Sequence, residues 1–170
     1  MYLKRKIDLF LEEWKKDADH KPLIVKGPRQ IGKTESIKRF GELHYDNVIE
    51  INFVEEPKYK TITADGYKTN DIIKIISRMD PSKKFEEGKT LIFFDELQEF
   101  PEIATALKFF KIDGRFDVIC SGSMLGINYR RIESISGCSG CEIGENVSKQ
   151  KKNKKRSGAF RRRKTSGRMS

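Results

Sequence analysis

Residues 23–34 read LIVKGPRQIGKT, an apolar run followed by a glycine-bearing turn and the start of a predicted helix. The last eight residues match Gly-x-x-x-x-Gly-Lys-[Ser/Thr] in full, in the strand–turn–helix context that this pattern requires. Glycines in such a turn let backbone N–H groups converge on phosphate oxygens, and the following helix N-terminus adds unpaired donors. The candidate phosphate-binding residues are Gly27, Pro28, Arg29, Gln30, Ile31, Gly32, Lys33 and Thr34.

Two side chains of this turn indicate the ligand. Lys33 supplies a positive charge for the β- and γ-phosphates of a nucleoside triphosphate, and the Thr34 hydroxyl is a candidate ligand of Mg²⁺. Arg29 either neutralises phosphate charge or forms a salt bridge at the surface, and the sequence leaves both open. We therefore predict that residues 27–34 bind ATP together with Mg²⁺.

A pair of acids follows the apolar run 91–94. Asp95 and Glu96 are expected at the carboxyl edge of a parallel sheet, where ligands of open α/β sheets bind. We predict that Asp95 holds Mg²⁺ through water alongside Thr34, and that Glu96 is the general base that orients the attacking water. A solvated strand end is the alternative interpretation of the two acids.

Ser121 and Ser123 end the next predicted strand. A polar side chain at this place commonly senses the γ-phosphate and positions water, so both serines join Lys33 and Glu96 as candidate catalytic residues. The sequence does not separate the two serines, and an ordinary turn is the other interpretation. Gln98 either lines the same site or is solvated at the start of a helix.

Apolar residues alternate between helical and strand spacing along the first 120 residues. Such alternation predicts an α/β fold with a mainly parallel sheet covered on both faces. Residues 55–70 are expected to be irregular, with Asn70 capping the next helix. The predicted strands are 23–26, 48–53, 91–94 and 116–120, and the predicted helices are 3–15, 33–43, 71–79 and a segment after Pro101.

The positive charge of the chain is concentrated near its C-terminal end. Residues 1–140 carry 24 basic and 23 acidic side chains, whereas residues 141–170 carry 11 basic and 2 acidic ones. Hydrophobic periodicity ends near Ser134. We predict a partial catalytic domain over residues 1–134 and a basic, disordered tail over residues 135–170.

Cysteines and apolar runs exclude other classes of protein. Cys138 and Cys141 have no second pair or nearby histidine with which to hold zinc, and Cys120 is expected to pack as a small hydrophobe. No apolar run approaches the ~20 residues of a spanning helix, and the first residues lack the apolar stretch of a signal peptide. We expect a cytoplasmic protein with no membrane partner.

On these motifs the chain resembles the AAA-type P-loop ATPases of the archaeal and bacterial group whose loop reads Gly-Pro-Arg-Gln-x-Gly-Lys-Thr. The resemblance rests on residues 27–34, on residues 95–98 with Pro101 soon after, and on residues 121–125, and it covers about residues 1–134. It implies a three-layer P-loop fold of the ASCE class, with the glutamate of the Walker B pair as the base and a sensor strand between the two Walker strands. It also implies a homo-oligomer in which a neighbour's arginine completes the site.

Members of this group continue with the rest of the ATPase domain and a helical portion, where this chain continues with a polybasic stretch. We therefore expect a fold that is incomplete at the C-terminus and has no fifth strand, through truncation or a reading frame shifted near Ser136. The pair Arg130 and Arg131 is either the arginine finger of such an assembly or part of a solvated loop.

The function predicted from the sequence is Mg²⁺-dependent ATP binding and hydrolysis. The main alternative is a module that binds nucleic acid through its tail, with nucleotide binding vestigial. A small nucleotide kinase would use the same loop, although it does not need a water-activating Glu96. A remnant that binds nucleotide poorly is the last alternative.

Overall fold

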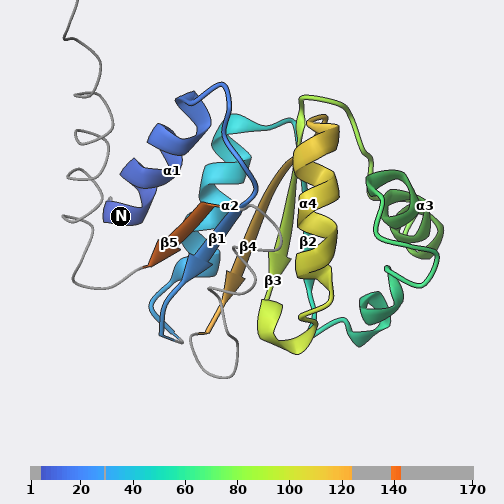
Figure 1. The fold of residues 1–170 in the computed structure, drawn as a ribbon. Helices are drawn as coiled ribbons and strands as arrows, with labels where there is room; N and C mark the ends of the chain where they lie inside the picture. The colour runs from blue at the N-terminus through green and yellow to red at the C-terminus, as the bar shows by residue number, and fades with distance from the viewer. Residues whose placement is uncertain (1–4, 29, 124–138, 143–170) are drawn as a thin grey trace, which may run out of the picture.

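The computed structural model describes residues 5–28 and 30–123 with their side chains and residues 139–142 by their backbone. Within these ranges, five parallel strands form one sheet in the order β2-β3-β4-β1-β5 (Figure 1). The fold is the α/β fold with a parallel sheet that the sequence predicts. The strands are β1 (Leu23–Lys26), β2 (Asn47–Asn52), β3 (Thr90–Asp95), β4 (Asp117–Gly122) and β5 (Ser139–Glu142).

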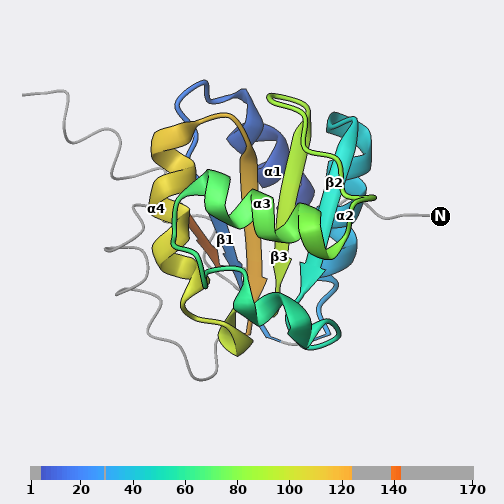
Figure 2. The ribbon, with the colours of Figure 1, turned by 90° about the vertical axis from the view of Figure 1, so that its right-hand side faces the viewer.

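Helices cover both faces of the sheet and make three layers. Figure 2 shows α3 and α4 in front of the sheet, with α1 and α2 behind it. The helices are α1 (Lys6–Lys16), α2 (Lys33–His44), α3 (Thr69–Met79) and α4 (Ile103–Asp113), and two short 3₁₀ turns are η1 (Pro57–Thr61) and η2 (Leu97–Glu99).

Alternate residues of β3 serve the two layers. Leu91 and Phe93 pack in the cluster formed with α1 and α2, whereas Ile92 and Phe94 pack in the cluster formed with α3 and α4. All four side chains are fully buried, and each such burial contributes about 1.5–3 kcal/mol. The sheet is thereby a rigid support for the residues at its carboxyl edge.

The predicted helices and strands are confirmed to within three residues at their ends, with one wrong cap. Helix α3 begins at Thr69, its cap residue is Lys68, and no side chain caps it. Asn70, the predicted cap, lies in the first turn, where its Oδ1 accepts a hydrogen bond from Arg115. The segment predicted to be irregular contains η1.

Strand β5 corrects the expectation that no fifth strand exists. Ser139–Glu142 pair in parallel with Leu23–Lys26 of β1. An edge strand can form without an apolar pattern of its own, because unpaired N–H and C=O groups of the neighbouring strand accept any extended segment. Four residues of the predicted tail therefore join the sheet, and the division at residue 134 stays a prediction.

Several sequence predictions fall outside the described residues. These concern Arg29, Arg130, Arg131, Cys138, the side chain of Cys141, and the predicted tail apart from residues 139–142. Within the described helices, none has both the length and the apolar character needed to cross a membrane.

Candidate functional site

The turn from Gly27 to Gly32 joins β1 to α2, which begins directly at Lys33. Gln30 and Gly32 have left-handed backbones, with φ of 62° and 74°. Gly32 is the cap residue of α2, and no side chain caps this end of the helix. The first N–H groups of any α-helix lack acceptors within the helix, so the start of α2 at this turn has the character of an anion-binding site.

The Lys33 side chain folds back into this turn. Its Nζ donates hydrogen bonds to the carbonyl oxygens of Gly27 at 3.0 Å and Pro28 at 2.6 Å, and the residue is 9% exposed. The ammonium group thus lies inside the turn, beside the N-terminus of α2. A buried positive charge and a helix N-terminus at one place favour a ligand that carries several negative charges.

Thr34 and Asp95 bring the turn and the acidic strand end together. The Thr34 hydroxyl donates to Asp95 Oδ2 at 2.9 Å, and Asp95 is 4% exposed. The other oxygen, Oδ1, accepts from the Ser121 hydroxyl and from the Glu96 N–H. Asp95 is therefore held by neutral donors from α2, from the residue that follows β3 and from β4.

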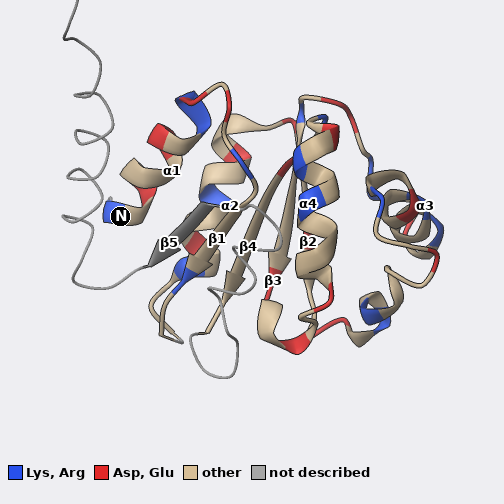
Figure 3. Cartoon of the chain, in the orientation of Figure 1, with Lys and Arg blue, Asp and Glu red and all other residues tan. Residues whose placement is uncertain are grey.

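The residues meet at the carboxyl edge of three neighbouring strands. In Figure 3, the red segments at the end of β3 and along η2 lie at the edge of the sheet where the turn between β1 and α2 also lies. The register pairs Phe94 with Cys120, so the next residues, Asp95 and Ser121, are neighbours. The sheet itself thus sets the geometry of this site.

Glu96 is the cap residue before η2 and has a left-handed backbone, with φ 57° and ψ 49°. Its Oε2 accepts a hydrogen bond from Gln98 Nε2, and Gln98 Oε1 accepts from the Ser123 N–H at 3.1 Å. The two serines therefore differ: Ser121 contacts Asp95 through its hydroxyl, whereas the Ser123 backbone is connected to Glu96 through Gln98.

Two residues that the sequence analysis does not single out also belong to the site. Asn52 ends β2, and its amide nitrogen lies 3.5 Å from Asp95 Oδ2. A polar residue at the end of a predicted strand is the same sequence signal that pointed to Asp95, and it could have pointed to Asn52. Arg5 Nη1 donates to the carbonyl oxygens of Ile31 at 3.1 Å and Gly32 at 3.2 Å. No sequence signal points to Arg5, because this contact depends on how α1 packs beside α2.

The possible metal ligands are oxygens. In the ranges described, no group of three or more His, Cys, Asp or Glu side chains could hold a metal ion. Thr34 Oγ1 and Asp95 Oδ2, 2.9 Å apart, are hard oxygen donors of the kind that Mg²⁺ selects. Cys120 is buried in the sheet, as predicted.

Comparison with known proteins identifies relatives. Residues 19–139 match the model of a family described as AAA domain. The replication factor C large subunit of Methanosphaera stadtmanae is 29% identical over 96 residues, which are 55% of this chain and 16% of that protein. This chain therefore matches only a small part of that curated relative.

Solved structures share the fold at low sequence identity. A chain of Drosophila ORC bound to DNA superposes with a TM-score of 0.51 and 11% identity, covering 86% of this chain and 94% of that one. Drosophila ORC bound to GC-rich DNA and Cdc6 gives 0.50 and 12%, covering 79% and 53%. At these identities the similarity supports the fold alone.

Proposed function

The chain belongs to the AAA domain family, and on this basis we propose that it binds ATP with Mg²⁺ and hydrolyses the nucleotide at the edge formed by residues 27–34, β3 and β4. One observation carries the proposal. The hydrogen bond from Thr34 to Asp95 joins a complete phosphate-binding sequence to an acidic strand end 61 residues later in the chain.

Binding of the triphosphate would use the turn and Lys33. The N–H groups of the turn and of the α2 N-terminus would donate to phosphate oxygens. Lys33 Nζ would exchange the neutral carbonyls of Gly27 and Pro28 for phosphate oxygens. Hydrogen bonds between two charged groups are roughly twice as strong as neutral ones, so this exchange favours the bound state.

Thr34 and Asp95 fit the role of holding Mg²⁺. This ion keeps several waters and takes only one or two protein ligands beside the substrate phosphates, so two oxygen donors are sufficient. When bound, the ion would neutralise charge on the β- and γ-phosphate oxygens. The Ser121 hydroxyl and the Glu96 N–H would keep the Asp95 carboxylate oriented.

Glu96 is the proposed base for hydrolysis. A water oxygen forms a bond to the γ-phosphorus as the bond from that phosphorus to the β–γ bridging oxygen breaks, and Glu96 accepts the water's proton. The products are ADP and inorganic phosphate. The left-handed backbone of Glu96 costs of order 1–3 kcal/mol, and such strain persists where the surroundings fix it, commonly at functional sites.

Phosphate release and ATP calorimetry test this proposal together. Glu96→Gln is expected to keep ATP binding and to slow hydrolysis by roughly 10²–10⁴-fold, because it removes the base. Lys33→Ala is expected to weaken binding itself. Glu99→Gln is the matched control, since Glu99 lies in the same turn and pairs with Lys60 at 3.6 Å. Unchanged hydrolysis in Glu96→Gln would remove Glu96 from the mechanism.

Nucleic acid is the second candidate partner. The 11 basic and 2 acidic residues of 141–170 favour it, and the Drosophila ORC assemblies in which this fold occurs are bound to DNA. Binding through such a segment would weaken by roughly 10³–10⁵-fold between 50 and 200 mM salt. Replacing Arg161, Arg162 and Arg163 with glutamate should make the affinity for DNA fall less steeply with salt concentration. DNA binding by the parent protein that does not change with salt would reject this second function.

A second copy of the chain is the remaining candidate partner. It would supply an arginine to the nucleotide, as the family resemblance implies. Sedimentation of the protein with and without ATP tests this assembly, and a monomer in both conditions would reject it.

A further inference from the structure

We propose that Gln98 is a positioning residue that holds the Glu96 carboxylate for hydrolysis and connects it to the end of β4 through Ser123. This inference rests on the proposed ATPase function. It concerns a side chain whose two amide atoms both make hydrogen bonds within the site, to Glu96 and to the Ser123 backbone.

The turn that carries Gln98 is fixed by the core. Leu97 of η2 is fully buried, and Phe100, the residue directly after η2, is 6% exposed. The backbone closes two turns, with the Glu99 N–H donating to the Glu96 carbonyl and the Phe100 N–H donating to the Leu97 carbonyl. Gln98 therefore projects from a rigid element, and its side chain starts from a defined place.

The two partners require one orientation of the Gln98 amide. The Ser123 N–H can only donate, so the Gln98 carbonyl oxygen must face it. A carboxylate can only accept, so the Gln98 NH₂ must face Glu96. A flipped amide would oppose two donors on one side and two acceptors on the other. Both contacts thus agree on the arrangement observed.

This contact leaves one Glu96 oxygen for water. Gln98 holds Oε2, and among the described residues Oε1 has no hydrogen bond. Holding one oxygen fixes the rotation of the carboxylate, so the other keeps a constant direction. A base acts only when it lies within hydrogen-bond reach of the proton that it takes, so a fixed direction raises the rate.

The end of β4 contacts Asp95 directly and is connected to Glu96 through Gln98. The Ser121 hydroxyl donates to Asp95, and the Ser123 N–H holds the amide that holds Glu96. A ligand that shifts this strand end would move the two carboxylates together. Gln98 is the link for the second of them.

Gln98→Met tests the proposal, because methionine keeps the length of the side chain without its hydrogen bonds. The expected result is a kcat lower by roughly 10- to 100-fold, the equivalent of one hydrogen bond to a charged group. KM and the calorimetric Kd for ATP should be unchanged. A role in stability alone would instead lower the Tm and leave kcat of the folded protein as it was.

A double variant shows whether Gln98 acts through Glu96. Adding Gln98→Met to Glu96→Gln should cause no further loss of single-turnover rate, since the group that Gln98 positions is already absent. An additional loss equal to that of Gln98→Met alone would overturn the proposal. Glu99→Gln, one residue away in the same turn, should leave all parameters unchanged.

Gln98→Glu covers the case in which Gln98→Met does not fold. It keeps an acceptor for the Ser123 N–H but places a like charge beside Glu96, so kcat should fall at least as far. Parental or raised kcat in a folded Gln98 variant overturns this inference and leaves the proposed function standing. A parent protein that releases no phosphate overturns the proposed function, and the inference with it.

Discussion

The Thr34 hydroxyl donates a hydrogen bond to the Asp95 carboxylate across 2.9 Å. Thr34 is the second residue of α2 and Asp95 is the last residue of β3. The contact exists because β1 and β3 lie on either side of β4 in a parallel sheet, so their carboxyl ends reach the same edge. The two side-chain oxygens that we propose as ligands of Mg²⁺ are thereby placed together.

Thr34→Val should weaken MgATP binding by roughly tenfold, because valine keeps the shape of threonine and removes the hydroxyl that we propose as a metal ligand. ATP in EDTA should bind to Thr34→Val as it binds to the parent protein. Calorimetry in both buffers measures the difference. Thr34→Ser is the control, since it keeps the hydroxyl. Equal weakening in EDTA would mean that the hydroxyl acts on the turn and not on the ion.

Gly32→Ala should destabilise the protein by about 1–2 kcal/mol through its left-handed backbone alone. A further loss is expected, because an added Cβ would lie 2.0 Å from Arg5 Nη1 and would displace its hydrogen bonds to the turn. Arg5 is flexible at its far end, so the clash itself can be relieved. Urea unfolding measures the free energy of each variant.

Gly88→Ala is the matched control for Gly32→Ala. Gly88 has φ 72°, almost the same as Gly32, and nothing lies within 4 Å of its Cβ position. The difference between the two losses therefore reports the Arg5 contact. In an Arg5→Ala background the two substitutions should cost equal free energy of unfolding. A difference that persists there would mean that the Arg5 contact is not its cause.

Most of the fold could be predicted because buried parallel strands and amphipathic helices have strong apolar patterns. Strand β3 contains the predicted run Leu91–Phe94 and is longer by only one residue at each end. Strand β5 could not be predicted in this way, because Ser139–Glu142 has no apolar pattern and its pairing depends on the exposed edge of β1.

The residues of the candidate site likewise fall into those that the sequence could predict and those that it could not. Lys33, Thr34, Asp95 and Glu96 could be singled out because each stands in a motif or directly after an apolar run. The difference between Ser121 and Ser123 could not, because it depends on the register that sets Ser121 beside Asp95. The Gln98 contacts likewise depend on how η2 packs beneath the end of β4, which no local pattern encodes.

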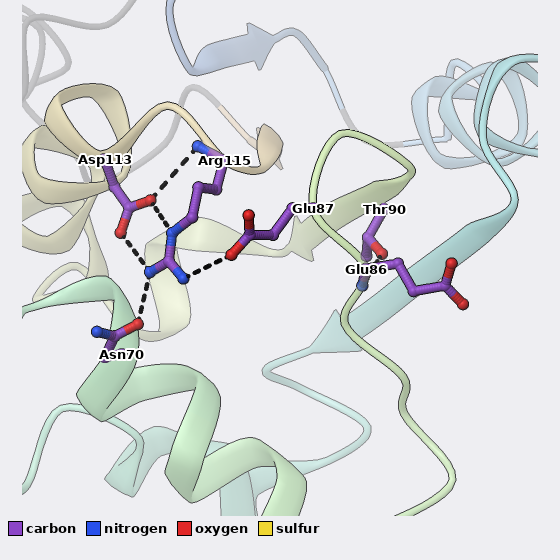
Figure 4. Close-up of polar contacts among 6 residues, drawn as sticks. All are labelled: Asn70, Glu86, Glu87, Thr90, Asp113 and Arg115. Atoms are coloured by element: carbon purple, nitrogen blue, oxygen red, sulfur yellow. Dashed lines mark hydrogen bonds and ion pairs between the residues drawn. The ribbon is translucent and has the colours of Figure 1, made fainter.

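Arg115 lies between α4 and β4 and joins three segments of the chain (Figure 4). Its guanidinium donates to Asp113 at the end of α4, to Glu87 before β3, and to Asn70 in the first turn of α3. The hydrogen bonds from Arg115 to Asp113, together with the positive charge of the guanidinium, lower the pKa of Asp113 below its usual value near 3.8. The ionised Asp113 is therefore favoured in the folded protein over the unfolded one.

Arg115→Met should lower the Tm at pH 7, and the loss should become smaller in acid. A carboxyl group whose pKa is lowered on folding contributes stability above its unfolded pKa and loses this contribution as the pH falls through its folded pKa. The difference in stability between parent and variant should thus begin to shrink near pH 4 and be smallest below it. Urea unfolding at pH 7 and at pH 3 measures the difference in the free energy of unfolding at each pH. Lys84→Met is the control for loss of an exposed positive charge. A difference that is the same at both pH values would show that Arg115 stabilises the fold by packing alone, without its pairing to Asp113.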